Sequence, residues 1–437
     1  MRHHLHLLLA AGLAAVSIGA AAAVHDWTAT RIGPFNTQGI SVADINNAGQ
    51  VAAWYAPTPF TQRGFLYTPG SSGGLVDLGS FGGSTTIPMA LNAGGQVVGW
   101  SQTPDGFAHG FISKDGRIQR LSLPGELFGG ASDINDRGQV LVNSRGADSI
   151  TRDAIFHPAG PPTVLSVPAG DTATRGPAFQ GINNRGQVFG SLASGGSYYY
   201  ANGQWVDIGT LGGDAIALAM NESGTIVGTS NHRPFIYSHG QMRQIAIGSG
   251  DDHGVAFDIN DHGQAVGINL SSRGGSEAFF YGDGQVQTLV DFGGGSTDAR
   301  EVNELGQVVG FSAVSVTMGQ PSDYHAFFYS SDDGRTTDVT RWLMNSFPDV
   351  ALVENSGMAL NDLGQFTVNA LMTNGQRAIF VLTPIPEPST YALMLVGLCT
   401  VVWIARRQRA ANPRSNERGA LSAEAKGLAC LTKGESQ

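Results

Sequence analysis

One short segment returns eight times along this chain and limits what the chain can fold into. Each copy has the form Asn-x-x-Gly followed by a short apolar run, as in residues 133–140, DINDRGQV. An Asn at the first turn position can accept a hydrogen bond from the backbone two residues on, and Gly three residues later can adopt a positive φ. The segment therefore predicts a type I turn with a G1 bulge, which closes a tight β-hairpin. The eight turn asparagines are Asn46, Asn92, Asn135, Asn183, Asn221, Asn260, Asn303 and Asn361.

Asp133 and Asp258 stand two residues before the asparagines of their turns, as at the start of a calcium-binding loop. Such a loop has an oxygen ligand at its fifth position and a bidentate Glu at its twelfth. Arg137 and His262 occupy the fifth position here, and no Glu follows at the twelfth. The turns are therefore expected to be structural, with no metal ion.

The turns recur about every 40 residues, with one longer interval between Asn303 and Asn361. One copy shows four strand-like segments, at residues 89–92, 96–101, 108–113 and 117–123. This period and strand count are typical of a β-propeller blade. A β-solenoid and a seven-bladed ring with one decorated repeat are the alternatives.

The last repeat lacks its fourth strand, since residues 377–383 run directly into the C-terminal segment. Residues 27–33 precede the first turn, have no partner of their own, and resemble the fourth strands at 75–79 and 205–209. We therefore expect the N-terminal strand to complete the last blade. This closure gives eight four-stranded blades and removes exposed sheet edges.

Most second strands have a small residue at the same position, which predicts a close approach of another backbone, expected from the neighbouring blade. Val142 and Val368 are exceptions. The small residues are Ala53, Gly99, Gly190, Gly228, Gly267 and Gly310.

Both ends of the chain resemble targeting segments. Residues 1–23 have a basic start, an apolar stretch and a run of Ala, which predicts a secretory signal peptide, with an uncleaved anchor as the alternative. At the other end, the apolar run 391–405 is followed by Arg406 and Arg407. The run is short for a membrane span, but the arginines are typical of the cytoplasmic side, so a transmembrane helix is expected.

The composition narrows the classes of function. The net charge is -10 and Lys114 is the only lysine before the C-terminal tail, so no basic surface is available for nucleic acid. The two cysteines, Cys399 and Cys430, lie near the C-terminus. The central region must therefore be stabilised by its core rather than by disulfides.

The repeated turn followed by a strand such as His325-Ala326-Phe327 resembles the bacterial extracellular HAF repeat. His109 begins a looser copy, and the other third strands keep only the aromatic part. The resemblance covers nearly all of residues 27–383. It implies an exported repeat protein and does not imply a reaction.

The C-terminal segment resembles a PEP-CTERM sorting signal. Its motif is Pro386-Glu387-Pro388 with Ser389, followed by the apolar run and Arg406-Arg407. The resemblance implies processing by an exosortase after export. The chain departs from the pattern by continuing to Gln437. The expected organisation is a signal peptide at 1–23, a propeller at 24–383, a sorting signal at 384–409 and a disordered tail at 410–437.

Few residues indicate catalysis. Residues 70–74, GSSGG, fit the nucleophile-elbow pattern but lie in a Gly/Ser loop without a following helix, so they are interpreted as a chance match. Asp251, Asp252 and His253 could bind a metal or act as acid and base, although a solvated loop is the simpler interpretation. His232 and His239 are expected to be exposed turn residues. No cofactor is predicted.

These observations favour an exported, cell-surface or secreted protein that binds or organises extracellular polysaccharide without catalysis. The expected partners are a signal peptidase, an exosortase, matrix polysaccharide and the membrane, and Trp54 and Trp100 are expected to be exposed aromatics. The alternative is a polysaccharide hydrolase or lyase that uses carboxylates on one face. The irregular repeat between Asn303 and Asn361 is the first place to search for a site.

Overall fold

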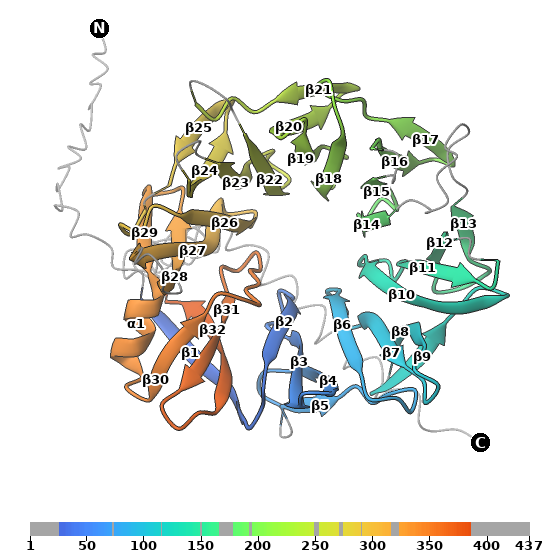
Figure 1. The fold of residues 1–437 in the computed structure, drawn as a ribbon, viewed down its shortest axis with the longest axis horizontal. Helices are drawn as coiled ribbons and strands as arrows, with labels where there is room; N and C mark the ends of the chain where they lie inside the picture. The colour runs from blue at the N-terminus through green and yellow to red at the C-terminus, as the bar shows by residue number, and fades with distance from the viewer. Residues whose placement is uncertain are drawn as a thin grey trace, which may run out of the picture. The chain divides into compact units, whose positions relative to one another are not determined.

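Eight four-stranded antiparallel sheets surround a common axis, as Figure 1 shows. The computed structural model describes residues 26–385 except 72–73, 115, 149–150, 166–177, 192–194, 249–252, 271–273, 290 and 316–322. Residues 27–383 form one unit. The predicted eight-bladed propeller is therefore confirmed, and the solenoid and seven-bladed alternatives are wrong.

The blades are numbered from 1 to 8 after the turn asparagines. In blades 1 to 7 the first strand of each sheet lies nearest the axis and the fourth lies toward the rim (Figure 1). Blades 1 to 4 contain β2 (Ile40–Ile45), β3 (Val51–Thr58), β4 (Thr61–Tyr67) and β5 (Leu75–Asp77); β6 (Thr86–Leu91), β7 (Val97–Gln102), β8 (Ala108–Lys114) and β9 (Arg117–Leu121); β10 (Glu126–Ile134), β11 (Val140–Gly146), β12 (Thr151–Phe156) and β13 (Thr163–Leu165); and β14 (Ala178–Ile182), β15 (Val188–Ser191), β16 (Ser197–Ala201) and β17 (Gln204–Asp207).

Blades 5 to 7 repeat this order. Their strands are β18 (Ala215–Met220), β19 (Ile226–Ser230), β20 (Arg233–Ser238) and β21 (Gln241–Gln244); β22 (Gly254–Ile259), β23 (Ala265–Leu270), β24 (Ser276–Gly282) and β25 (Gln285–Thr288); and β26 (Thr297–Val302), β27 (Gln307–Ser315), β28 (Asp323–Ser330) and β29 (Arg335–Asp338).

Blade 8 joins the two ends of the repeat region. It contains β30 (Val350–Glu354), β31 (Phe366–Met372), β32 (Arg377–Pro384) and, as its outer strand, β1 (Trp27–Phe35). The expected closure by the N-terminal strand is therefore present. Trp27 is 4% exposed, and its ring meets Phe328 of blade 7 and Phe366 of blade 8 edge to face, at 5.7 and 5.8 Å between centroids. Strand β1 is thus both hydrogen-bonded to β32 and packed into the core through Trp27.

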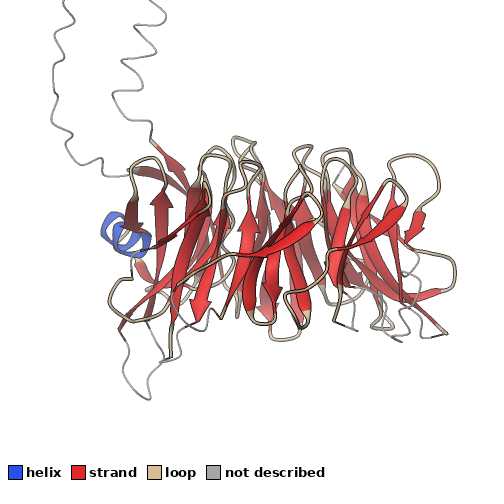
Figure 2. Cartoon of the chain, turned by 90° about the horizontal axis from the view of Figure 1, so that it is seen from above, coloured by secondary structure: helices blue, strands red, loops and turns tan. Residues whose placement is uncertain are grey.

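The long interval between Asn303 and Asn361 contains the one α-helix among the described residues, α1 (Val339–Ser346), which Figure 2 shows beside the strands. Asp338 caps its N-terminus by accepting a hydrogen bond from the backbone N–H of Arg341 at 2.8 Å. The other carboxylate oxygen of Asp338 lies 2.8 Å from Nδ1 of His325, the histidine of the full HAF copy.

The expected reason for the small residues in the second strands is wrong. A Cβ added at Gly99 would overlap the carbonyl oxygen of Ile87, which belongs to the inner strand of the same blade. Gly228, Gly267 and Gly310 have equivalent neighbours. The inner strand carries a β-bulge at this level, and the bulge turns a carbonyl toward the second strand. The glycine thus accommodates the blade's own bulge rather than the next blade.

The apolar core lies between neighbouring sheets and follows them around the ring. One cluster joins Val309 and Phe328 of blade 7 to Phe366 and Phe380 of blade 8. Within the described chain no helix has the length and hydropathy to cross a membrane, and the helix expected at 391–405 lies outside the described residues.

Candidate functional site

The turn asparagines form a closed ring of hydrogen bonds around the axis. Oδ1 of Asn135 accepts from the backbone N–H of Arg137 and Gln139, as the turn requires. Its Nδ2 donates to the carbonyl oxygen of Asn183 in the next blade at 2.8 Å. All eight asparagines make the bond to the next blade, at 2.8–3.2 Å, and Asn361 returns it to Asn46. Each side chain therefore closes its own turn and joins two blades.

The glycine that ends each turn has a φ between 67° and 83°, the left-handed conformation that the turn type requires. We did not predict from the sequence that each turn asparagine also bonds to the next blade. The sequence does contain a signal for this bond. Asp or Ser could accept the hydrogen bonds within the turn equally well. Only Asn supplies the amide donor as well, and all eight copies have Asn.

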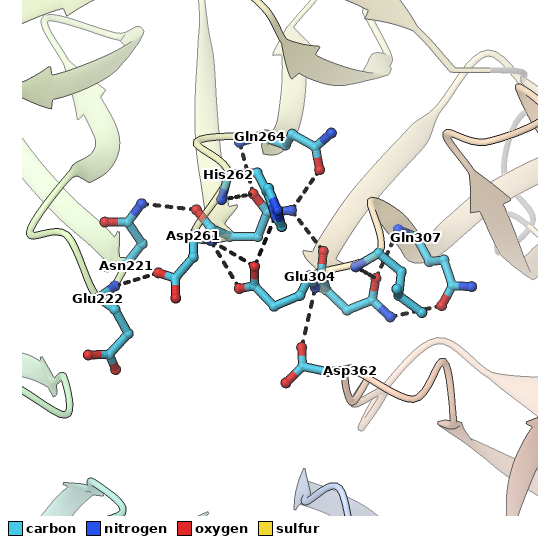
Figure 3. A network of polar contacts seen from close by, with 11 residues as sticks. Asn221, Glu222, Asp261, His262, Gln264, Glu304, Gln307 and Asp362 are labelled. Carbon is cyan, nitrogen blue, oxygen red and sulfur yellow. Dashed lines mark hydrogen bonds and ion pairs between the residues drawn. The ribbon is translucent and has the colours of Figure 1, made fainter. Parts of the chain in front are cut away.

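A second ring lies at the next turn position, and Figure 3 shows part of it. The backbone N–H of Asp261 donates to the carboxylate of Glu304 at 3.0 Å, and that of Glu304 donates to Asp362 at 3.3 Å. Seven of the eight positions make such a bond. The ring is interrupted at Ala93, which has no side-chain acceptor for the N–H of Asn47.

Four carboxyl groups lie two residues before the asparagines, on the inner strands of blades 1, 3, 6 and 7. Each accepts a backbone N–H of the next blade at 2.7–2.9 Å. These residues are partly exposed, but their carboxyl groups are enclosed by protein. Burial raises the pKa of Asp44 to about 6 and of Asp133 to about 7, against the lowering effect of the hydrogen bonds. Burial likewise raises the pKa of Asp258 and Glu301. Because the contact recurs in four blades, it is structural.

A recess lies in the irregular repeat, where blade 8 meets blades 7 and 1. It has a volume of about 610 Å³. Its polar lining includes Gln38, Asp323, Glu354, Asn355 and Arg377, and Tyr324 supplies an aromatic ring. This composition offers planar hydrogen-bonding groups beside an aromatic surface.

The recess exists because the inner strand of blade 8 is interrupted. Pairing with β31 stops at Glu354 and resumes at Leu360, which is bridged to Phe366. The intervening segment is held by the side chain of Asn369, whose Nδ2 donates to the carbonyl oxygen of Ser356 at 2.9 Å.

Arg377 and Glu354 of the recess are paired with each other. Nε of Arg377 donates to Glu354 at 2.8 Å, and Nη1 donates to the carbonyl oxygen of Thr37 at 2.9 Å. Asn355 and Ser356 also line a second cavity of about 420 Å³, together with Glu301 and Arg300. The guanidinium of Arg300 lies 5.0 Å from the centroid of the Phe257 ring.

Other residues singled out in the sequence lie elsewhere. Trp54 and Trp100 are half-buried rather than exposed, because they stand in second strands between two paired neighbours. Strand β5 follows residues 70–74, so no helix completes a nucleophile elbow. Asp251, Asp252 and the sorting residues 386–389, 406 and 407 lie outside the described residues. Within the described part of the chain, no group of three or more His, Cys, Asp or Glu could hold a metal ion.

Comparison with known proteins identifies the C-terminal segment. Residues 384–410 match the model of the PEP-CTERM protein-sorting motif. This signal implies an exported, cell-envelope-associated protein that is sorted by an exosortase. No curated protein matches the sequence.

Three solved structures illustrate the similarity of fold. An acylaminoacyl peptidase from Pyrococcus horikoshii is 11% identical over 76% of this chain and 58% of its own, with a TM-score of 0.44. The WD40 domain of SCAP from fission yeast is 9% identical over 82% of this chain and 98% of its own, with a TM-score of 0.44. The BP39L lectin from Burkholderia pseudomallei is 13% identical over 66% of this chain and 94% of its own, with a TM-score of 0.36. The chain thus spans less than two thirds of the peptidase, and similarity at this level carries no argument about function.

Proposed function

We propose that this protein is a non-enzymatic binding or structural component of an extracellular polysaccharide matrix, and that the recess beside blade 8 holds the polysaccharide. The observation that carries the proposal is the lining of the recess. Sugar hydroxyls are both donors and acceptors, and the recess presents both from Gln38, Asn355 and the Arg377–Glu354 pair. Tyr324 adds an apolar face against which a sugar ring can pack.

The sorting signal supports a location of this protein outside the cytoplasm, where such a matrix is found. The body is delivered to the cell surface or secreted after a signal peptidase removes residues 1–23. Residues 391–405 hold it transiently at the inner membrane until an exosortase acts on the sorting signal. The HAF-like repeat of residues 24–383 is consistent with an extracellular role.

Binding of matrix polysaccharide is the measurement that tests the proposal. Purified full-length protein is titrated with extracellular polysaccharide from an exosortase-containing bacterium, and binding is measured by affinity electrophoresis. Tyr324→Ala and Asn355→Ala are each expected to weaken binding by about tenfold or more, since each removes a contact worth about 1–2 kcal/mol. Phe60→Ala is the control, because Phe60 is 86% exposed on blade 1 and is not among the residues that line the recess. Equal binding by all four proteins would exclude the recess.

A polysaccharide hydrolase or lyase is the second candidate, since Glu301 has a raised pKa and lines the adjoining cavity. Its contact with the N–H of Leu360, which three other blades repeat, favours a structural role for this carboxyl. Release of new reducing ends or unsaturated sugars from the bound polysaccharide, lost in Glu301→Gln, would support the enzyme instead.

A further inference from the structure

Two histidines of neighbouring blades lie side by side on the surface, far along the chain from the recess residues. His232 is at the tip of the hairpin between β19 and β20 in blade 5, and His253 directly precedes β22 in blade 6. Both are exposed, and their ring centroids are 5.7 Å apart with 53° between the planes.

The backbone of both residues is fixed by hydrogen bonds. The carbonyl oxygen of His232 accepts from the N–H of Gly254 at 2.7 Å, which ties the hairpin tip to blade 6. The carbonyl oxygen of His253 accepts from the N–H of Leu270 at 2.7 Å. The backbone positions that carry the two imidazoles are therefore held close together by the two blades.

His232 occupies a position that the turn would fill better with glycine. Asn231 and His232 have φ values of 49° and 63°, so both central residues of this hairpin are left-handed. The comparable pairs Asn202-Gly203, His239-Gly240 and Asp283-Gly284 have glycine second. A side chain in this conformation is strained, on the order of 1 kcal/mol or more. The turn itself therefore does not explain why a histidine stands here.

We propose that His232 and His253 bind one divalent transition-metal ion, such as Zn²⁺, Ni²⁺ or Cu²⁺, across the seam between blades 5 and 6. Neutral imidazole nitrogens bind such ions at about 2.0–2.1 Å. At that bond length each ring centroid lies about 3.2 Å from the metal. Two ligands near the tetrahedral angle then have ring centroids about 5.2 Å apart. The observed separation of the two rings is 5.7 Å, close to this value. The remaining coordination positions are open to water or to an oxygen ligand.

The test is a titration of the full chain with ZnCl₂ and NiCl₂ by isothermal calorimetry at pH 7.5, with the same titration for variants. His232→Gly and His253→Ala are each expected to lose one equivalent of metal or to weaken it at least tenfold. His239→Asn is the matched control, because His239 is another left-handed turn residue, in blade 5, and Asn tolerates that conformation. The double variant His232→Gly/His253→Ala measures how much metal is bound by other groups, such as the histidines near the N-terminus.

A thermal melt separates metal binding from folding. In EDTA, His232→Gly is expected to melt at or above the temperature of the parent, because the left-handed strain is removed. In saturating Zn²⁺, the parent is expected to melt higher than in EDTA by an increment that His232→Gly lacks. If the parent binds no more metal than the double variant, or if His232→Gly keeps the full Zn²⁺-dependent increment, the site does not exist.

Discussion

At the scale of single residues, one amide side chain accounts for much of the repeat. Asn accepts two hydrogen bonds from its own turn and donates one to the next blade, so three backbone groups near the axis are satisfied by one residue. The residue after each turn Asn accepts a second hydrogen bond between blades wherever its side chain has an oxygen atom. The eight copies of the turn therefore keep the same Asn because each copy supplies a hydrogen bond to the next blade.

The gap in the second ring gives a prediction of increased stability. Ala93→Asn supplies the acceptor that the N–H of Asn47 lacks, so the free energy of unfolding is expected to rise by about 0.5–1.5 kcal/mol. Chemical denaturation of the parent and the variant measures the change. Ala48→Asn, at an exposed turn position outside the ring, is the control. Equal stability of the two variants would show that the second ring contributes nothing.

One buried carboxyl predicts a pH dependence of stability. Asp153 is 1% exposed, and neither of its carboxylate oxygens has a hydrogen-bond partner in the described structure. Burial raises its pKa from 3.8 to about 8. Blade 4 has Ser197 at the same place, and its hydroxyl bonds to Ala215 and Ala217.

The folded state therefore keeps this proton over a pH range in which the unfolded state has lost it. Below about pH 4 both states are protonated and the group has no effect. Between about pH 4 and 8 the parent is expected to lose stability, relative to Asp153→Ser, by at most about 1.4 kcal/mol per pH unit. Urea denaturation of both proteins from pH 4 to 9 measures the difference. A difference that does not change with pH would mean that Asp153 titrates normally.

At the scale of elements, the closing strand and the interrupted strand are both in blade 8. Strand β1 completes this blade at one edge, whereas after β30 the inner edge is left unpaired over residues 355–359. One interruption of pairing creates the recess, and the hydrogen bonds of Asn369 and Arg377 keep it open. The site thus arises where the repeat is least regular.

The role of β1 can be measured through its buried ring. Trp27→Ala is expected to lower the free energy of unfolding by about 3–5 kcal/mol, since it empties a packed site between blades 7 and 8. Loosening of β1 also exposes the edge of β32, so self-association is expected. Thr30→Ala, at an exposed position of the same strand, is the control. Thermal melts and size-exclusion chromatography give both readouts, and a monomer as stable as the control would contradict the closure.

At the scale of the whole molecule, the ring and the sorting segment perform separate tasks. The propeller of residues 27–383 has its own core and its own closed set of hydrogen bonds. The signal at 384–410 determines delivery. Folding of the body therefore does not require the C-terminal segment to be retained.

Processing is the prediction that belongs to this scale. Changing Pro386, Glu387 and Pro388 to Ala is expected to leave export unchanged and to trap a longer, membrane-bound form in a host with an exosortase. Cell fractionation and mass spectrometry of the C-terminus distinguish the two forms. A parent protein that keeps residues 391–437 outside the cell, or a mutant that is trimmed equally, would show that this segment is only an anchor.

The sequence by itself determined the features that depend on local chemistry and on counting. The turn type follows from Asn and Gly at fixed spacing, and the blade number follows from eight such turns. The closing strand follows from an unpartnered segment at one end and a missing strand at the other. The sorting segment could also be predicted, because its signal is a linear motif.

Only the tertiary structure decided which groups meet across blades. The amide of each Asn bonds to the turn asparagine of the next blade, 38–58 residues along the chain or, from Asn361, back at Asn46. The glycines Gly99, Gly228, Gly267 and Gly310 each face a bulge whose carbonyl direction has no sequence pattern. The recess depends on pairing that stops at Glu354 and resumes at Leu360. The histidine pair depends on a hairpin of blade 5 that meets the start of β22 in blade 6. Such contacts are set by how the sheets are placed around the axis, which no short segment encodes.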